Sequence, residues 1–177
     1  MTETFNELIS TLNLELSLAK GIRIKSVILL FRLATYSYLG KSPIRYTFRP
    51  VSVLYKLYAE FLLGIELPAG TVIGPGLRLY HGVGLVVHKN VRFGSNCVLR
   101  QGVTIGNKSG DGTGANGVPV IGNDVEFGAG AIVIGEVTIG NNATIGAGVV
   151  VTKDVPENSV VVGPAPRILV KKIENNA

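Results

Sequence analysis

Residues 121–151 read IGNDVE FGAGAI VIGEVT IGNNAT IGAGVV V when they are divided after every sixth residue. Each group opens on an aliphatic or aromatic residue, and these are Ile121, Phe127, Val133, Ile139, Ile145 and Val151. A period of six fits neither the repeat of about 3.6 residues in a helix nor the two-residue alternation of an ordinary strand. We interpret it as a solenoid in which three six-residue sides close a triangular coil and each leading side chain points inward. The sequence therefore predicts a mainly β protein built as a parallel β-helix.

The register continues upstream after an interruption. Earlier members are Ile73, Leu79, Val87, Phe93, Leu99 and Ile105. Ile105 and Ile121 are sixteen residues apart, which is ten more than one side requires. The intervening residues are rich in glycine, so we expect residues 107–118 to leave the coil as a loop.

A second, shorter interruption lies at a histidine. Leu79 and Val87 are eight residues apart, and the two extra residues fall within 80–84, which contain His81. Imidazole titrates near neutral pH and is the side chain best suited to act as a general base. Glu66 precedes His81 by fifteen residues, close to one coil, so it is expected to stack beside His81 and orient the imidazole.

The segment before the repeat is predicted to be helical. Apolar residues spaced by three or four indicate helices over residues 2–19, over 22–39 and from about Pro50 to Gly64, with a turn at 41–44. We therefore divide the chain into a helical N-terminal region (1–64), a β-helix (65–166) and a C-terminal tail (167–177).

Composition narrows the functional classes. The 177 residues include 23 glycines and are 46% hydrophobic and 16% charged, which is ample for a packed core. Cys97 is the single cysteine, so it cannot form an intramolecular disulfide, and we interpret it as a packed residue. No segment resembles a signal peptide or a spanning helix. We expect a cytoplasmic protein, at most at the inner membrane surface, and no nucleic-acid partner despite the net charge of +5.

Basic and aromatic residues alternate in the helical region. The basic ones are Lys20, Arg23, Lys25, Arg32, Lys41, Arg45, Arg49 and Lys56. Such a pattern suits the surface of an anionic membrane. A helical cap that packs on the solenoid and on other subunits is the interpretation we favour over membrane contact.

Several segments together resemble the serine acetyltransferase branch of the hexapeptide-repeat acyltransferases. They are Ile65-Glu-Leu-Pro, residues 73–87, Leu99-Arg-Gln-Gly-Val-Thr-Ile-Gly, Gly146-Ala-Gly-Val-Val-Val and Gly163-Pro-Ala-Pro-Arg. The helical N-terminus is similar to that of acetyltransferases of colanic-acid, capsule and other exopolysaccharide synthesis. The resemblance implies a left-handed β-helix, a homotrimer, and acetyl transfer from acetyl-CoA to a hydroxyl without a metal.

The resemblance also implies residue roles. His81 matches the general base and Glu66 its acidic partner, while backbone N–H groups at glycine-rich corners are expected to stabilise the oxyanion. Acetyl-CoA is expected along the coil edges at a subunit boundary. The positions implied for it are Gly106, Asn107, Gly128, Ala129, Ala147, Lys153 and Arg167.

Two departures from the serine acetyltransferase pattern concern the acceptor. Tyr80 stands where those enzymes carry an Asp before the histidine, and Val118 stands near Pro119 where they carry an Arg-His pair. Charged contacts for an amino acid are therefore lacking, and we predict that Tyr80 and Val118 contact a sugar or polysaccharide precursor.

Other functions stay open at this point. They are serine acetylation, acetylation of an antibiotic or nucleotide-sugar, and a non-catalytic scaffold. A metal-dependent solenoid enzyme would need three histidines, and the chain has only His81 and His88. We interpret His88 as a surface residue.

Overall fold

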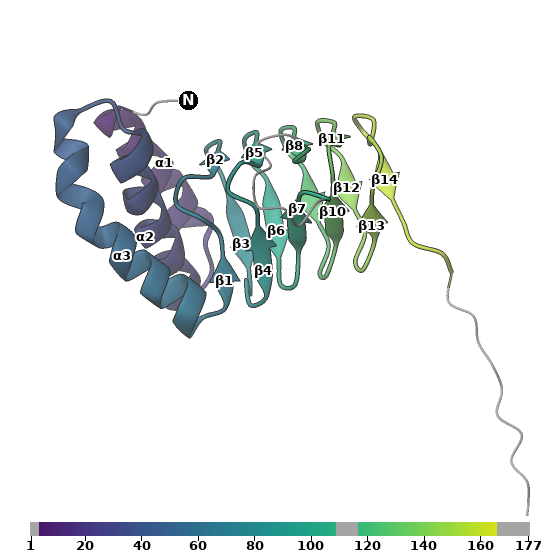
Figure 1. Cartoon of the computed structure of the whole chain (residues 1–177), viewed down its shortest axis with the longest axis horizontal. Helices are drawn as coiled ribbons and strands as arrows, with labels where there is room; N and C mark the ends of the chain where they lie inside the picture. Colours follow the sequence, from purple (N-terminus) through teal and green to yellow (C-terminus); the bar gives the residue numbers. More distant parts are fainter. Residues whose placement is uncertain (1–3, 109–116, 166–177) are drawn as a thin grey trace, which may run out of the picture.

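The computed structural model describes residues 4–108 and 117–165, and it consists of a helical cap on one end of a three-sided solenoid (Figure 1). The coils stack along one axis, the helices cover the first coil, and the last strands lie at the opposite end (Figure 1). The fold prediction, a parallel β-helix with a helical N-terminal region, is confirmed.

The helical cap begins with α1 (Phe5–Leu18), whose Thr4 and Glu7 form a capping box at the first turn. α2 spans Ile22–Leu39, as the spacing predicts. The turn expected at 41–44 is instead the start of the 3₁₀ helix η1 (Pro43–Phe48), since Ser42 caps it and Pro43 occupies its first turn. α3 (Arg49–Lys56) continues into the π-helical turn η2 (Leu57–Leu62). Among these described helices, none combines the length and apolar character needed to cross a bilayer.

Fourteen short strands form the three sides of the described solenoid. Side A contains β1 (Ile65–Glu66), β4 (Leu85–Val87), β7 (Thr104–Gly106), β10 (Ile132–Ile134) and β13 (Val150–Val151). Side B contains β2 (Val72–Ile73), β5 (Arg92–Phe93), β8 (Val120–Ile121) and β11 (Thr138–Ile139). Side C contains β3 (Arg78–Tyr80), β6 (Val98–Arg100), β9 (Glu126–Phe127), β12 (Thr144–Ile145) and β14 (Val160–Val161). The strand pairs are parallel.

The interior uses two positions of each side rather than one. All register residues from Ile73 to Val151 are buried, as expected. The residues two positions before them are buried as well, for example Val125 before Phe127 and Val137 before Ile139. Side chains alternate between the two faces of a strand, so positions two apart point the same way. The sequence prediction of one inward side chain per side was therefore incomplete.

Two of the three corners between sides differ in their chemistry. At the B–C corner, Asn96, Asp124, Asn142 and Asn158 have φ values of 55–60°. Asn and Asp tolerate this left-handed conformation. Their side chains bond from coil to coil, with Asn96 Nδ2 donating to Asp124 Oδ1 at 3.0 Å. At the C–A corner the left-handed positions are mostly glycines, including Gly102, Gly130 and Gly148.

The first coil is two residues longer than the second. Val86 pairs with Thr104, eighteen residues later, whereas Glu66 pairs with Val86, twenty residues later. The two extra residues lie between Leu79 and Leu85, where the sequence register breaks. They also correct one prediction, because Glu66 stacks beside Val86 and not beside His81.

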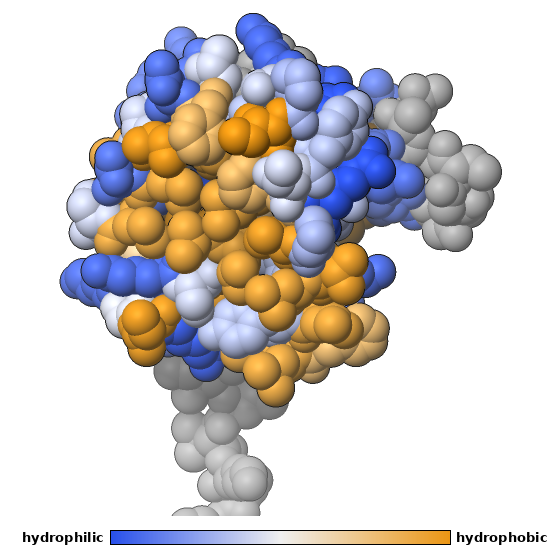
Figure 2. All heavy atoms as spheres, turned by 90° about the vertical axis from the view of Figure 1, so that its left-hand side faces the viewer, coloured by the Kyte–Doolittle hydropathy of each residue, from blue (hydrophilic) through white to orange (hydrophobic). Residues whose placement is uncertain are grey.

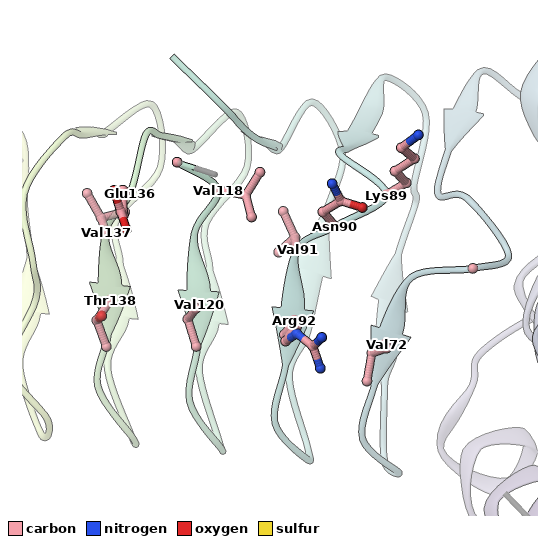
Figure 3. A pocket seen from close by; sticks show the side chains of 12 residues that line it. Val72, Lys89, Asn90, Val91, Arg92, Val118, Val120, Glu136, Val137 and Thr138 are labelled. Atoms are coloured by element: carbon pink, nitrogen blue, oxygen red, sulfur yellow. The ribbon is translucent and has the colours of Figure 1, made fainter. Parts of the chain in front are cut away.

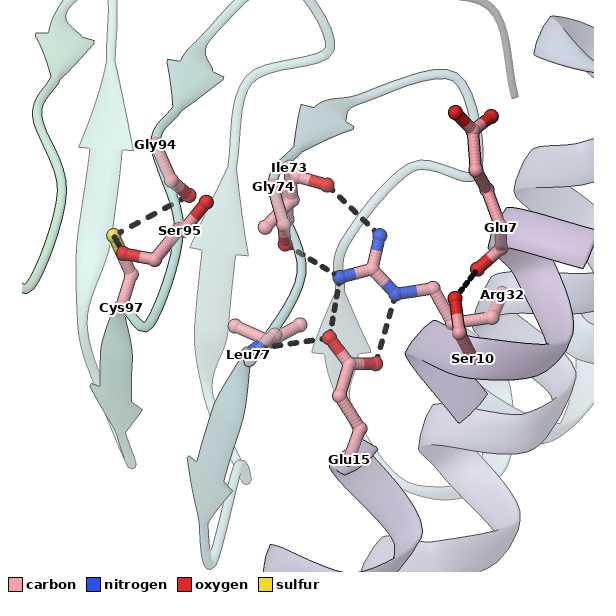
Figure 4. A network of polar contacts seen from close by, with 10 residues as sticks. All are labelled: Glu7, Ser10, Glu15, Arg32, Ile73, Gly74, Leu77, Gly94, Ser95 and Cys97. Carbon is pink, nitrogen blue, oxygen red and sulfur yellow. Dashed lines mark hydrogen bonds and ion pairs between the residues drawn. The ribbon is translucent and has the colours of Figure 1, made fainter. Parts of the chain in front are cut away.

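A buried ion pair joins the cap to the first coil (Figure 4). Arg32 of α2 and Glu15 of α1 are both fully buried, and Arg32 Nε donates to Glu15 Oε2 at 2.8 Å. Arg32 also donates to the carbonyls of Ile73 and Gly74 at 2.8 Å, and the Leu77 amide donates to Glu15 Oε1. Arg32 is therefore a structural residue of the interior and not part of the basic surface to which the sequence assigned it.

Candidate active site

His81 occupies a strained turn immediately after β3. Its φ is +66°, and the Gly82 amide donates to the Tyr80 carbonyl at 2.8 Å across it. A hydrogen bond from residue i+2 to residue i around a positive-φ residue is the rare form of γ-turn. Non-glycine residues hold such conformations at a cost, and they gather at functional sites. The turn leaves His81 exposed at the C–A corner.

The cap holds this turn from the side. Arg23 of α2 donates from Nη2 to the His81 carbonyl at 2.6 Å. A guanidinium bond to a carbonyl is charge-assisted and stronger than a neutral hydrogen bond. Arg23 thus links the orientation of α2 to the backbone of His81. No sequence pattern indicates this contact, because the two residues are separated by 58 positions.

Glu66 and His81 flank the same corner. The Gly84 amide donates to the Gly64 carbonyl at 2.8 Å, which ties the chain just before Glu66 to the turn that contains His81. Glu66 itself is exposed on β1. Within the described residues, the Glu66 carboxylate and the His81 imidazole form neither a hydrogen bond nor an ion pair with each other, so the structure brings them near one corner without joining them.

Tyr80 belongs to a polar row on side C. Arg100, its register neighbour, lies with its guanidinium carbon 5.1 Å from the Tyr80 ring centre. Arg100 Nη2 is 2.7 Å from Glu126 Oε1 on the next coil. The aromatic ring of Tyr80, directly before His81, is therefore held in place by a cation–π contact with Arg100. Arg100 and Glu126 were missed from the sequence because their contact with Tyr80 depends on the stacking register.

The residues expected to hold acetyl-CoA divide between the two edges of side A. Ala129 and Ala147 lie at the C–A corner that also contains His81, and the Gly148 amide donates to the Ala129 carbonyl at 2.9 Å. At the opposite edge, Gly106 is the last residue of β7 and Lys153 follows β13. Asn107 follows Gly106 at that edge, and Arg167 lies outside the described residues.

Gly128 has a structural reason to be glycine. A Cβ at this position would lie 2.5 Å from the backbone nitrogen of Ala147 on the next coil. Close stacking of the coils thus accounts for the missing side chain without a ligand.

Backbone amides at the C–A corner are already used. Those of Gly102, Gly130 and Gly148 donate to carbonyls of the preceding coil at 2.9–3.0 Å. These three amides are thus committed to holding the coils together, which argues against them as donors to an oxyanion.

Val118 lines a groove of about 560 Å³ on side B, away from the C–A corner (Figure 3). Its other walls include Val72, Val120 and Thr138, and Lys89, Arg92 and Glu136 supply charges. One chain therefore places Val118 and His81 on different sides of the solenoid. Most of the loop expected at 107–118 lies outside the described residues.

Cys97 and His88 take no part in this arrangement. Burial raises the pKa of the Cys97 thiol to about 11, which keeps it protonated and unreactive. His88 is half-buried rather than at the surface, and its Nδ1 accepts from the Asn90 amide at 3.3 Å. The described residues contain no cluster of three His, Cys, Asp or Glu side chains of the kind that binds a metal ion.

Comparison with known proteins identifies the repeat. Residues 119–153 match the family described as bacterial transferase hexapeptide (six repeats), and residues 84–110 match the hexapeptide repeat of succinyl-transferase. The Escherichia coli (strain K12) protein named "Putative colanic acid biosynthesis acetyltransferase WcaB" is 44% identical over 123 residues, which are 70% of this chain and 74% of that protein. Serine acetyltransferase of Helicobacter pylori (strain ATCC 700392 / 26695) is 36% identical over 116 residues, 64% of this chain and 65% of that protein.

Solved structures agree with this assignment. Apo soybean serine acetyltransferase superposes with a TM-score of 0.75 at 26% identity, over 93% of this chain and 69% of that chain. Serine acetyltransferase isoform 3 of Entamoeba histolytica superposes with a TM-score of 0.68 at 30% identity, over 86% and 52%. The three-sided solenoid and its repeat define a hexapeptide transferase. The chain belongs to the hexapeptide-repeat acetyltransferase family, and it is an acyltransferase.

Proposed function

We propose that this acetyltransferase moves the acetyl group of acetyl-CoA to a hydroxyl of a sugar or polysaccharide precursor, with His81 as the general base. The observation that carries the proposal is the turn at His81, a strained backbone held by Arg23 at an exposed corner. Strain of this kind persists only where the surrounding structure enforces it.

The chemistry follows from an imidazole at that corner. Neutral His81 accepts the proton of the acceptor hydroxyl while the oxygen attacks the thioester carbonyl carbon. The carbon–sulfur bond then breaks, the ester forms, and the departing CoA thiolate takes the proton back from the imidazolium. Such base catalysis is worth about 10² to 10⁴ in rate. Glu66 is the candidate to orient the imidazole, since it is exposed beside the same corner.

We further propose that the site is completed by a second copy in a trimer. His81 and Val118 lie on different sides of one chain, so a neighbouring copy that packs on side A would bring the two together. The outward positions of side A support such packing, because Val86 and Val150 expose apolar side chains there. Acetyl-CoA would then lie between copies, with Ala129 and Ala147 at one edge and Gly106 and Lys153 at the other.

The acceptor class is supported by residues beside the base and by the relative with 44% identity. Tyr80 presents an aromatic ring where a carboxylate would be needed to bind an amino group, and Arg100 beside it is paired with Glu126. Serine acetylation is the second candidate, because serine acetyltransferases are also among the similar proteins.

A panel of acceptors tests the proposal. CoA thiol release from acetyl-CoA would be followed with L-serine, free sugars, nucleotide-sugars and lipid-linked oligosaccharides. We expect kcat/KM for the best sugar acceptor to exceed that for L-serine by at least about 100-fold, because removing charged contacts costs a zwitterion about 3 kcal/mol or more. L-serine as the best acceptor would overturn the sugar assignment, and no transfer to any acceptor would overturn the function.

Arg23 provides a second expected result. Replacing Arg23 by Ala removes a charge-assisted bond of about 1.5 to 3 kcal/mol from the His81 carbonyl, and we expect kcat to fall about tenfold or more. KM for acetyl-CoA should change less than twofold, because Arg23 contacts the His81 turn of the first coil, whereas Ala129 and Ala147 lie at the same corner on later coils. Arg23→Lys should retain part of the rate that Arg23→Ala loses. Lys25 is the next basic residue of α2 and is exposed, so Lys25→Ala is the matched control and should leave kcat unchanged. Equal kcat in Arg23→Ala and the parent enzyme would show that the turn holds without the contact.

A further inference from the structure

The helix formed by α3 and η2 exposes a stripe of large apolar side chains, which we call the α3 stripe. Its members are Val53, Leu54, Leu57, Phe61 and Leu62. Phe61 and Leu62 are 76% and 72% exposed. The spacing of four between Val53, Leu57 and Phe61 places them on one face of the helix.

The opposite face of the same helix packs inward. Tyr55 and Ala59 are buried, and Tyr55 Oη donates to the Leu67 carbonyl of the first coil at 2.7 Å. The α3 stripe therefore points away from the solenoid. Figure 2 views the molecule from this end and shows apolar side chains gathered across it, with polar ones around them. Soluble proteins rarely leave contiguous apolar surface of this kind uncovered.

Positive charge is concentrated in the helical cap that carries this stripe. Residues 16–59 contain eight Lys and Arg and no Asp or Glu, whereas the rest of the chain has nine basic and twelve acidic residues. One of the eight, Arg32, is buried in its ion pair, and the other seven lie nearer the surface. Arg49 and Lys56 are exposed on α3 itself, and Lys56 Nζ also lies 4.0 Å from Glu60 Oε2 on η2, the one acidic residue of this helix. Arg45 and Arg49 also lie over the half-exposed ring of Tyr46, at 4.8 and 5.0 Å from its centre.

We propose that the α3 stripe and the basic residues around it bind the surface of an anionic lipid bilayer. Apolar side chains that enter the headgroup boundary and cations that face acidic lipids are the two components of interfacial binding. A second copy on the same face would bring two positively charged surfaces together, which opposes that occupant. The binding does not depend on the acetyl-transfer chemistry. It would place the enzyme at the surface where lipid-linked acceptors reside.

Sedimentation of the full chain with lipid vesicles tests the proposal. We expect binding to vesicles of phosphatidylglycerol and phosphatidylcholine at about 0.1 M salt, strong weakening at 1 M salt, and little binding to pure phosphatidylcholine. The double variant Arg49→Gln with Lys56→Gln should bind about 25-fold more weakly, since each cation near an acidic surface contributes about fivefold. Leu57→Ser with Phe61→Ser should reduce binding by more than tenfold.

Matched controls distinguish binding through the α3 stripe from non-specific adsorption through any exposed apolar residue. Val162 is 74% exposed at the far end of the solenoid, so Val162→Ser should leave vesicle binding unchanged. Circular dichroism should be the same for all variants. The proposal would be overturned if the Leu57→Ser, Phe61→Ser variant bound vesicles as strongly as the parent protein. A failure of the parent protein to bind anionic vesicles would also overturn it. A loss of self-association in that variant, seen by sedimentation velocity without any vesicle binding, would assign the stripe to a second copy instead. A protein that binds vesicles but transfers no acetyl group would retain this inference and lose the proposed function.

Discussion

Replacing His81 by Ala is expected to lower kcat with the best acceptor by about 100-fold to 10,000-fold, the range typical of a lost general base. KM for acetyl-CoA should change little, because the thioester does not need the imidazole in order to bind. CoA thiol release at saturating acetyl-CoA measures both quantities. The substitution also removes a polar side chain from an exposed turn, so the free energy of unfolding should change little.

His88 supplies the matched control for His81. It is the second histidine of the chain, it follows β4 at the edge opposite the C–A corner, and its imidazole accepts from the local Asn90 amide. His88→Ala should keep kcat within about threefold of the parent enzyme, since it touches neither His81 nor the C–A corner. Full turnover by His81→Ala would remove the proposed base and leave the strained turn without a catalytic explanation.

Glu66 extends the same test. If its carboxylate orients the imidazole, Glu66→Gln should lower kcat by less than His81→Ala does, and the double variant should be no slower than His81→Ala alone. Residues that act as one unit show this non-additivity. Additive losses would place Glu66 in another role, which its register position beside Val86 would allow.

The six-residue register could be predicted because every side of the solenoid repeats the same inward position. Ile121, Phe127 and Val133 stand at that position on sides B, C and A, so spacing alone located them. The break at His81 could be predicted for the same reason, since two added residues lengthen the spacing between Leu79 and Val87 from six to eight. Stacking partners were harder to predict, because each depends on the summed length of all corners between two strands. For this reason the predicted stacking neighbour of Glu66, His81, lies five residues before the observed one, Val86.

Contacts between the cap and the solenoid could not be predicted. Arg23 and Arg32 both look like surface cations in the sequence, yet one holds the His81 carbonyl and the other is buried. A helical period shows which residues share a face, but it does not show what that face meets. Their partners in the solenoid lie 41 to 58 positions away in the sequence.

The second large effect is expected at the buried ion pair. Glu15→Ala should lower the free energy of unfolding by about 3 to 5 kcal/mol, because it leaves the Arg32 guanidinium buried without its counter-charge. The Leu77 amide would also lose its acceptor, which is a further cost. Urea denaturation at one fixed protein concentration measures the change, since any association would make stability depend on concentration.

A double-mutant cycle tests whether the pair also stabilises the fold through its hydrogen bonds to the backbone of the first coil. Glu15→Leu with Arg32→Met removes both ions, so it should destabilise by less than the sum of the single changes. It should not recover the parent stability, because the carbonyls of Ile73 and Gly74 and the Leu77 amide would all lose their partners in the interior. Lys56→Ala breaks the exposed pair with Glu60, 4.0 Å apart, and should cost at most about 1 kcal/mol. A Glu15→Ala effect as small as that control would mean that water reaches the pair and that the cap is held to the first coil by apolar packing alone.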